Sequence, residues 1–400
     1  MKLWTGQSLS EVGTEVTRLA LPTAAIVLLG AGPFQVGLLG AFEYLAFPLL
    51  GLIAGVYADR LKRRRMLIVC DFGRLVALAS VPAAYFLGLL SLYQLYAVAL
   101  LTGICTVFFD VAYQSYLPAL VERGDLLEAN SKLEITRSTA QIVGPAAAGG
   151  LIQLLRPAAA ILVDAASYLV SVLTLVWIHQ SEPDARPSLA EASSFLGEMW
   201  EGIKVVLGHP IIRLISGSTS VSNLGSNMGF AVLLLFAYNQ LHLTPGAVGL
   251  VFAIGSVGAL IGAFVAVPLA RRIGLGPTIA LGTGGGGLAS FLIPLASFGF
   301  AFPLLAAGFF IVLMGGTLYN INQVSLRQAI IPVRLQGRLN ATVRTIVWGT
   351  IPIGAFSGGL LGSRIGLVPT LYVSAAIGTL AVLFILAGPV RLREQPAPVD

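Results

Sequence analysis

Long apolar runs recur along the whole chain, and short segments between them carry most of its charge. A helix needs about 20 mainly apolar residues to cross the hydrocarbon core of a bilayer. Only 10% of the 400 residues are charged, whereas a soluble domain carries roughly 25%. An apolar soluble enzyme of this length would lack the polar groups to cover its surface. The sequence therefore predicts an integral membrane protein.

The runs are continuously apolar and do not alternate over ten-residue pieces, as strands of a membrane barrel do. They predict an all-α integral membrane protein with twelve transmembrane helices. The expected spans cover about residues 3–30, 35–57, 66–88, 91–112, 133–154, 158–178, 211–238, 246–269, 275–298, 301–325, 339–362 and 366–389.

The lysines and arginines of the short loops favour one orientation, because such residues accumulate on the cytoplasmic side. With the N-terminus inside, the expected outer loops hold only Arg156 and Arg364. The inner loops and tail hold Arg60, Lys62, Arg63, Arg64, Arg65, Arg123, Lys132, Arg186, Lys204, Arg271, Arg272, Arg327, Arg334, Arg338, Arg391 and Arg393. We expect a multi-pass protein of the inner (plasma) membrane with both termini in the cytoplasm.

The longest hydrophilic stretch divides the expected spans into six and six. It predicts a six-helix bundle at 1–180, a cytoplasmic linker with an amphipathic helix at 181–210, a second six-helix bundle at 211–390 and a cytoplasmic tail at 391–400. An internal repeat agrees with this division, since Arg137 precedes Pro145 by the same eight residues as Arg344 precedes Pro352. Parallel repeats of this kind are typical of two-halved transporters.

The segment between the second and third expected spans has a distinctive pattern. It reads Gly55-Val56-Tyr57-Ala58-Asp59-Arg60-Leu61-Lys62-Arg63-Arg64. It resembles the loop motif G-x-x-x-D-R-x-G-R-R of the major facilitator superfamily, with Lys62 where that family usually has glycine. The resemblance implies a cytoplasmic gate that includes Gly55, Asp59 and Arg60. Anchoring at the anionic inner leaflet is the alternative, but it does not require an aspartate beside Arg60.

A second pattern surrounds the fifth expected span: Leu117-Pro118-Ala119-Leu120-Val121, Glu128-Ala129-Asn130, Arg137-Ser138, Gly144-Pro145 and Gly149-Gly150. It resembles the subfamily of enterobactin exporters and macrolide efflux carriers, and Gly144, Pro145, Gly149 and Gly150 resemble its antiporter motif. The resemblance implies two pseudo-symmetric six-helix bundles and efflux of a drug, macrolide or siderophore-like molecule by proton antiport. The fourth expected span lacks the arginine that many proton-coupled drug exporters carry there, so the coupling ion stays open.

Ionisable side chains within membrane spans are costly and are therefore candidates for function. Glu11, Glu15 and Arg18 share one face of the first expected span, at i, i+4 and i+7. We expect this stripe to face a substrate and proton cavity. Two interpretations stay open: a carboxylate there exchanges protons, or Glu15 and Arg18 form a static pair. Further isolated charges within spans are Glu43, Asp164 and Arg344.

Another group of charges lies near the expected cytoplasmic ends of the spans. Asp71 and Arg74 are spaced i, i+3, and Asp110 and Arg137 follow on the next two spans. With Asp59 they could form an inner gate network, while side chains that reach to the membrane surface are the alternative.

Motifs for other chemistry are missing from the sequence. The histidines never stand at metal-ligand spacing, Cys70 and Cys105 fall inside apolar runs, and there is no H-E-x-x-H, G-x-S-x-G or Walker phosphate loop. We therefore expect no cofactor, no metal, no enzyme activity and no nucleic-acid partner. The expectation is a monomeric secondary active transporter that moves a small molecule by alternating access, with the proton as coupling ion. An uptake carrier or a lipid or lysolipid flippase of the same fold is the alternative.

Overall fold

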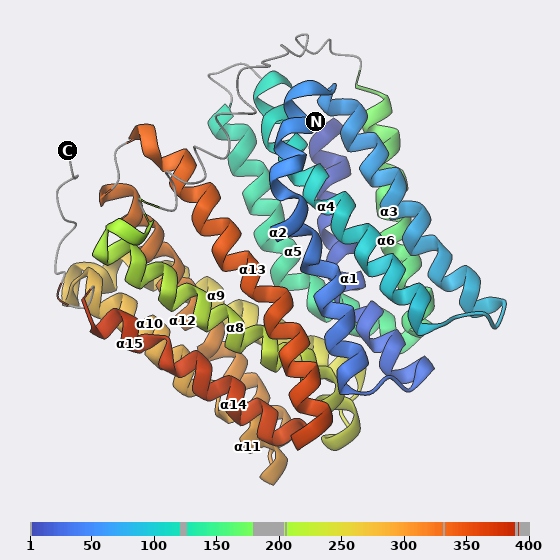
Figure 1. Ribbon diagram of the computed structural model, residues 1–400. Coiled ribbons are helices and arrows are strands. Elements are labelled where there is room, and N and C mark those ends of the chain that lie inside the picture. The colour runs from blue at the N-terminus through green and yellow to red at the C-terminus, as the bar shows by residue number, and fades with distance from the viewer. Residues whose placement is uncertain are drawn as a thin grey trace. The chain divides into compact units, whose positions relative to one another are not determined.

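The computed structural model describes residues 2–120, 126–178, 204, 206–330, 333–388 and 391, with backbone only for some helical positions. Helices account for nearly all of these residues, and the described part contains no strand. The chain is therefore all-α, as predicted (Figure 1).

The first part of the chain forms long helices joined by short connections, because each apolar run continues until Gly, Pro or charged residues interrupt it. They are α1 (Lys2–Leu29), α2 (Pro33–Arg60), α3 (Arg63–Phe86), α4 (Leu92–Leu120), α5 (Leu126–Leu155) and α6 (Pro157–Val176).

The second part is also helical but is interrupted more often. It contains α8 (Pro210–Leu235), α9 (Pro245–Ile273), α10 (Leu275–Ala289), α11 (Leu292–Leu295), α12 (Ala301–Ile330), α13 (Val333–Ile365), α14 (Leu367–Leu380) and α15 (Val382–Leu386). A π-helical turn, Phe236–Gln240, extends α8, and a 3₁₀ turn, Ala296–Phe298, follows α11.

Within the described residues, eleven helices are long and apolar enough to cross a membrane. The helix α5 is not among them, because its first half carries charged side chains and its second half contains Gln141 and Gln153. Its 30 residues still extend about 45 Å, enough to cross a bilayer.

The chain divides into two compact units. The N-terminal unit comprises Met1–Leu189 and Thr244–Ala253, and the C-terminal unit comprises Ala190–Leu243 and Ile254–Asp400. The start of α9 thus belongs to the N-terminal unit. The sequence, which predicted boundaries at 180 and 210, did not predict this assignment. Most of the expected linker, at 181–203 and 205, and the tail at 392–400 lie outside the described residues.

Helix packing follows the same order in both units. In the N-terminal unit α1 packs on α5 and α6, and α3 packs on α4 and α6. In the C-terminal unit α8 packs on α13 and α14, and α10 packs on α12 and α14. This correspondence agrees with the internal repeat of the sequence and with a pseudo-symmetric pair of bundles.

Small residues let these helices approach closely. Gly103 of α4 lies against the backbone of Glu43 in α2, and Gly258 of α9 lies against the backbone of Phe310 in α12. Cys70 and Cys105, which fall inside apolar runs of the sequence, are buried free thiols in an apolar core of the N-terminal unit.

Candidate functional site

The charged stripe of the first span lies on α1, as the helical spacing predicts. Gln7 Nε2 donates to Glu11 Oε1 at 3.2 Å, and Arg18 Nη1 lies 3.6 Å from Glu15 Oε1. The Arg18 side chain is 50% exposed and that of Glu15 is 13% exposed. Arg18 lies about 24 Å from the start of α1. A charge at this depth faces water or polar groups and not hydrocarbon.

A second helix adds to this stripe. Glu43 and Tyr44 of α2 lie within electrostatic range of Arg18. Glu43, which stood alone in the sequence, therefore shares a cation with Glu15. The close contact of α2 with α4 at Gly103 fixes the backbone at Glu43.

The helix α5 also contributes residues that act on the Glu15 side chain. Gly144 lies against Glu15, since a Cβ at residue 144 would come within 2.7 Å of Glu15 Cβ. Arg137, two turns earlier on α5, acts electrostatically on Glu15. We call Glu15, Arg18, Glu43 and Arg137 the α1 charge cluster. The sequence grouped Arg137 with the gate candidates, and that role stays a prediction; the structure adds its electrostatic effect on the α1 stripe.

The other residues of the antiporter-like motif have different surroundings. Pro145 lies inside α5. A Cβ at Gly149 would come within 2.9 Å of Gly249 Cα at the start of α9, so the two backbones approach closely there. Gly150 has no atom within 4 Å of such a Cβ position. The four residues of the motif thus differ: Gly144 contacts Glu15, Pro145 lies within α5, Gly149 allows a close helix crossing and Gly150 faces open space.

A second polar group is buried between α3, α4 and α6. Arg74 Nη2 lies 2.8 Å from Asp71 Oδ1, and both residues belong to α3. Ser171 of α6 donates to Asp71 Oδ2 at 2.5 Å. Asp71 is completely buried and Arg74 is 6% exposed, so neither side chain reaches out to the membrane surface, which was the alternative to a gate network. Their role in a gate remains a prediction.

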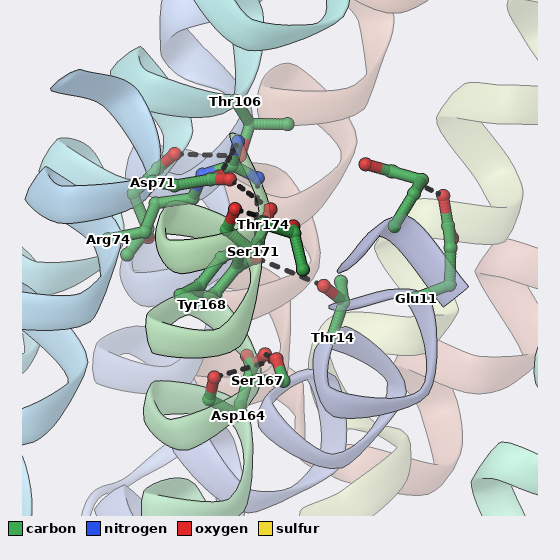
Figure 2. Close-up of polar contacts among 12 residues, drawn as sticks. Glu11, Thr14, Asp71, Arg74, Thr106, Asp164, Ser167, Tyr168, Ser171 and Thr174 are labelled. Atoms are coloured by element: carbon green, nitrogen blue, oxygen red, sulfur yellow. Dashed lines mark hydrogen bonds and ion pairs between the residues drawn. The ribbon is translucent and has the colours of Figure 1, made fainter. Parts of the chain in front are cut away.

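Two aromatic rings enclose the Arg74 guanidinium. Its Cζ lies 4.3 Å from the centre of the Phe109 ring and 4.6 Å from that of Tyr168. Arg74 Nη1 also donates to Tyr168 Oη at 3.3 Å, and that hydroxyl pairs with Thr14 Oγ1 of α1 at 3.0 Å. Figure 2 shows Tyr168 between the Asp71–Arg74 pair and Asp164. The planar cation thus connects three helices.

Asp164 lies one turn before Tyr168 on α6 and is 1% exposed. Ser167 Oγ donates to Asp164 Oδ1 at 3.1 Å and to the Asp164 carbonyl at 2.8 Å. The helix α1 passes directly over this carboxyl at Gly13, where a Cβ would come within 2.5 Å of Asp164 Oδ1. Asp71, Arg74, Asp164, Tyr168 and Ser171 form what we call the α3–α6 polar cluster.

The gate motif lies where α2 ends and α3 begins. Lys62 has an extended backbone, with φ −62° and ψ 115°, so this turn does not need the glycine of the family pattern. Arg64 donates to the carbonyls of Leu175 and Val176, at 2.8 and 2.6 Å, and so caps the end of α6. Gly55 lies on α2 with open space beside it.

Some predicted positions cannot be placed in full. The side chains of Asp59, Arg60 and Arg344 lie outside the described residues, although their backbones belong to α2 and α13. Asp110 of α4 is half-buried and acts electrostatically on Arg74. Among the residues that the structure describes, no group of three or more His, Cys, Asp or Glu side chains could hold a metal ion.

Sequence reasoning missed Tyr168, Ser171, Phe109 and Gly13. A signal for two of them was present, because Asp164, Ser167, Tyr168 and Ser171 repeat at helical spacing on one face of an apolar span. Such a polar stripe in a membrane helix indicates contact with other polar groups.

Comparison with known proteins identifies the family. The profile of the family described as transmembrane secretion effector matches residues 1–398. The chain belongs to this family of major facilitator transporters. It is therefore a multi-pass membrane transporter, which confirms the family resemblance and fold class expected from the motifs.

Several relatives match at low identity over most of their length. The MFS-type transporter YfiS of Bacillus subtilis is 25% identical over 98% of this chain and 92% of its own. The multidrug efflux pump Tap of Mycolicibacterium fortuitum is 25% identical over 86% and 84%. The enterobactin exporter EntS of Citrobacter koseri is 26% identical over 87% and 82%.

Solved structures share the fold. A bacterial homologue of the iron transporter ferroportin, in its inward-facing state, superposes with a TM-score of 0.78 at 19% identity, covering 96% of this chain and 97% of that one. A D-xylose-proton symporter superposes with a TM-score of 0.72 at 14% identity, covering 99% of each. At these identities the likeness concerns architecture alone.

Proposed function

We propose that this transporter exports a hydrophobic or amphipathic small molecule, of drug, macrolide or siderophore type, in exchange for protons. The two six-helix halves alternate access to a central site, and both termini lie in the cytoplasm. The family description as a secretion effector and relatives named as efflux pumps and exporters support the direction of transport. The loop arginines support the orientation.

The α1 charge cluster carries this proposal. Arg18 is half-exposed although it lies deep in an apolar helix, and Glu15 and Glu43 flank it. Water or a polar group of the cargo then solvates these charges. Aromatic side chains adjoin them, since the rings of Tyr44 and Phe47 stack at 6.2 Å. Charged groups beside aromatic rings suit a cargo with one polar end and an apolar body.

The cluster also indicates how the cargo is held. Glu15 is fixed by Gly144 behind it and by Arg18 beside it. We assign Glu15, Arg18 and Glu43 to binding of the cargo's polar group. Removing the Glu15 charge then weakens cargo binding and leaves insertion into the membrane intact.

Accumulation in cells that lack their own pumps tests the function. Cells that express the transporter should hold less ethidium, erythromycin or catecholate siderophore than cells with an empty vector. A proton uncoupler should remove the difference. Glu15→Gln should reduce the export, whereas Glu134→Gln, at an exposed position of α5, serves as the matched control.

The alternatives predict different results. Higher accumulation in expressing cells would identify an uptake carrier. Unchanged accumulation of all three compounds, with faster transbilayer movement of a fluorescent lysolipid in vesicles, would identify a flippase. Export that continues in the presence of the uncoupler would contradict proton exchange.

A further inference from the structure

The carboxyl groups of this chain are distributed very unevenly. Between Gly202 and Arg393 the sequence contains no aspartate or glutamate, although this segment includes every helix from α8 to α15. A carboxyl group that carries a proton through the transport cycle must therefore belong to the N-terminal helices. The carboxyls within α1 to α6, away from the helix ends, are Glu11, Glu15, Glu43, Asp71, Asp110, Glu134 and Asp164, and of these Glu134 is exposed.

These carboxyls differ in what compensates their charge. Glu15 and Glu43 share Arg18, which is itself half-exposed. Asp71 has Arg74 at 2.8 Å and the Ser171 hydroxyl at 2.5 Å. Asp164 is as deeply buried as Asp71, but the side-chain donors at its carboxyl are the neutral hydroxyls of Ser167 and Thr17.

The α3–α6 polar cluster has more carboxyl groups than cations, and this imbalance indicates that one of its carboxyl groups is protonated. Asp71 and Asp164 together face a single guanidinium, that of Arg74. Two ionised carboxylates would leave one uncompensated negative charge in a buried, apolar site, and a buried group in that position takes up a proton instead. Asp71 forms the ion pair, so the proton belongs on Asp164.

Among the side chains that the structure describes, no other charge is placed to relieve this imbalance. Three helices pack on α6, namely α1, α3 and α5. From α3, Asp71 and Arg74 act on Asp164. From α1, Gly13 and Thr17 face it, whereas Glu11 and Glu15 each stand two residues from Gly13 and so point to the opposite side of that helix.

The charged residues of α5 are also remote. Asp164 lies about two turns after the connection from α5, while Arg137 lies about five turns before it. Glu128, Lys132 and Glu134 are more distant still along that helix. Asp110 of α4 acts on Arg74 and adds a further negative charge to the same guanidinium.

We propose that Asp164 is the proton-binding site of this transporter, held as a neutral carboxylic acid between α1 and α6. This inference rests on the proposed proton exchange and names its carrier. The same helix α1 that covers Asp164 with Gly13 carries Glu15 and Arg18 on its other side. A shift of α1 on cargo binding admits water to Asp164, the carboxyl O–H bond breaks, and the proton passes to that water. The carboxylate later takes a proton from water on the opposite side of the membrane.

Infrared difference spectroscopy tests the protonation without any cargo. The full-length protein, reconstituted in lipid at neutral pH, should show the carbonyl stretch of a protonated carboxylic acid, and Asp164→Asn should remove it. Glu134→Gln, at an exposed position of α5 remote from Asp164, is the matched control and should keep the band. Asp71→Asn should also remove it, because Arg74 then compensates an ionised Asp164. Ser167→Ala should shift the band by removing its hydrogen bond, which provides a second test if Asp164→Asn does not fold.

A transport measurement tests the role in coupling. With ethidium in vesicles, Asp164→Asn should abolish accumulation driven by a proton gradient, while exchange of labelled for unlabelled ethidium should continue. A protonated-acid band that survives in Asp164→Asn, or gradient-driven accumulation at the wild-type rate in that variant, would overturn the proposal. If the wild-type protein transports nothing while Asp164→Asn loses the band, the proton site stands and the proposed export fails.

Discussion

Gly144 of α5 lies directly against Glu15 of α1, with space for a hydrogen but not for a methyl group. This contact explains why a glycine of the antiporter-like motif matters to a charged residue on another helix. The backbone of α5 packs against the Glu15 side chain and limits the rotamers that this side chain can adopt.

Gly144→Ala should therefore reduce export and stability. The added methyl group would meet Glu15 Cβ at 2.7 Å and Cγ at 2.9 Å, and overpacking of this kind costs about 1–3 kcal/mol. Gly150→Ala is the matched control, because nothing lies within 4 Å of its Cβ position. Thermal unfolding in detergent and export rates in cells would check both, and equal effects of the two substitutions would contradict the contact.

Arg74 should contribute strongly to the stability of the N-terminal unit. Arg74→Ala leaves the buried Asp71 carboxylate without its cation, and breaking such a pair costs about 3–5 kcal/mol. Asp71→Asn combined with Arg74→Ala should cost less than the sum of the two single changes, because the charges compensate each other. Arg74→Lys should lower the free energy of unfolding by less than Arg74→Ala. It keeps the positive charge, but lysine cannot stack a planar head group between Phe109 and Tyr168. Unfolding free energies of the four variants would give the coupling, and simple additivity would refute it.

The sequence predicted the helices well because an apolar run of membrane length has few alternatives. It also placed Glu11, Glu15 and Arg18 correctly on one face, since helical spacing alone determines which residues share a face. It did not reveal which neighbour that face meets. Glu43 is 25 residues from Arg18 along the chain, and only the packing of α2 brings it into range.

Asp71 and Arg74 illustrate the same limit more strongly. Their i, i+3 spacing indicates a pair, but a pair can face lipid headgroups, water or another helix with equal ease. Ser171 follows Asp71 by 100 residues, and nothing local to either residue joins them. The sequence therefore grouped these charges as gate candidates without their neighbours, and the structure shows them enclosed among α3, α4 and α6.

Arg64 should contribute to the stability of the protein, whereas its neighbour Arg65 should not. Its guanidinium donates to two carbonyls at the end of α6, and hydrogen bonds from charged groups contribute more than neutral ones. Because this contact is partly exposed, Arg64→Ala should cost about 1 kcal/mol. Arg65→Ala, at an exposed position on the same helix, should leave the unfolding midpoint unchanged. Equal effects would mean that both arginines act only as membrane anchors.

His209 should make the start of α8 sensitive to pH. Its Nδ1 accepts from the Ile212 N–H at 3.4 Å, and partial burial lowers its pKa from the ordinary value of 6.5. The folded state then binds fewer protons than the unfolded state, so this contribution to stability is present above about pH 6.5 and is lost as the pH falls through the lowered pKa. Protonated Nδ1 cannot accept the bond, and its charge opposes the helix dipole. Hydrogen exchange of the first turn of α8 should accelerate in mild acid, and His209→Asn should keep the cap without the pH dependence.

The orientation of the helices can be tested with the two short loops on either side of α3. If the N-terminus is cytoplasmic, Lys62 before α3 lies inside and Leu89 after it lies outside. Both native cysteines are buried, so their replacement by alanine provides a background with no reactive thiol. A membrane-impermeant maleimide added to intact cells should label Leu89→Cys, whose position is 70% exposed, and not Lys62→Cys. Inverted vesicles should reverse the result, because the same loops then face the opposite solution. Labelling of Lys62→Cys in intact cells would invert the assignment of the cytoplasmic side and, with it, the location of the Gly55–Arg64 motif.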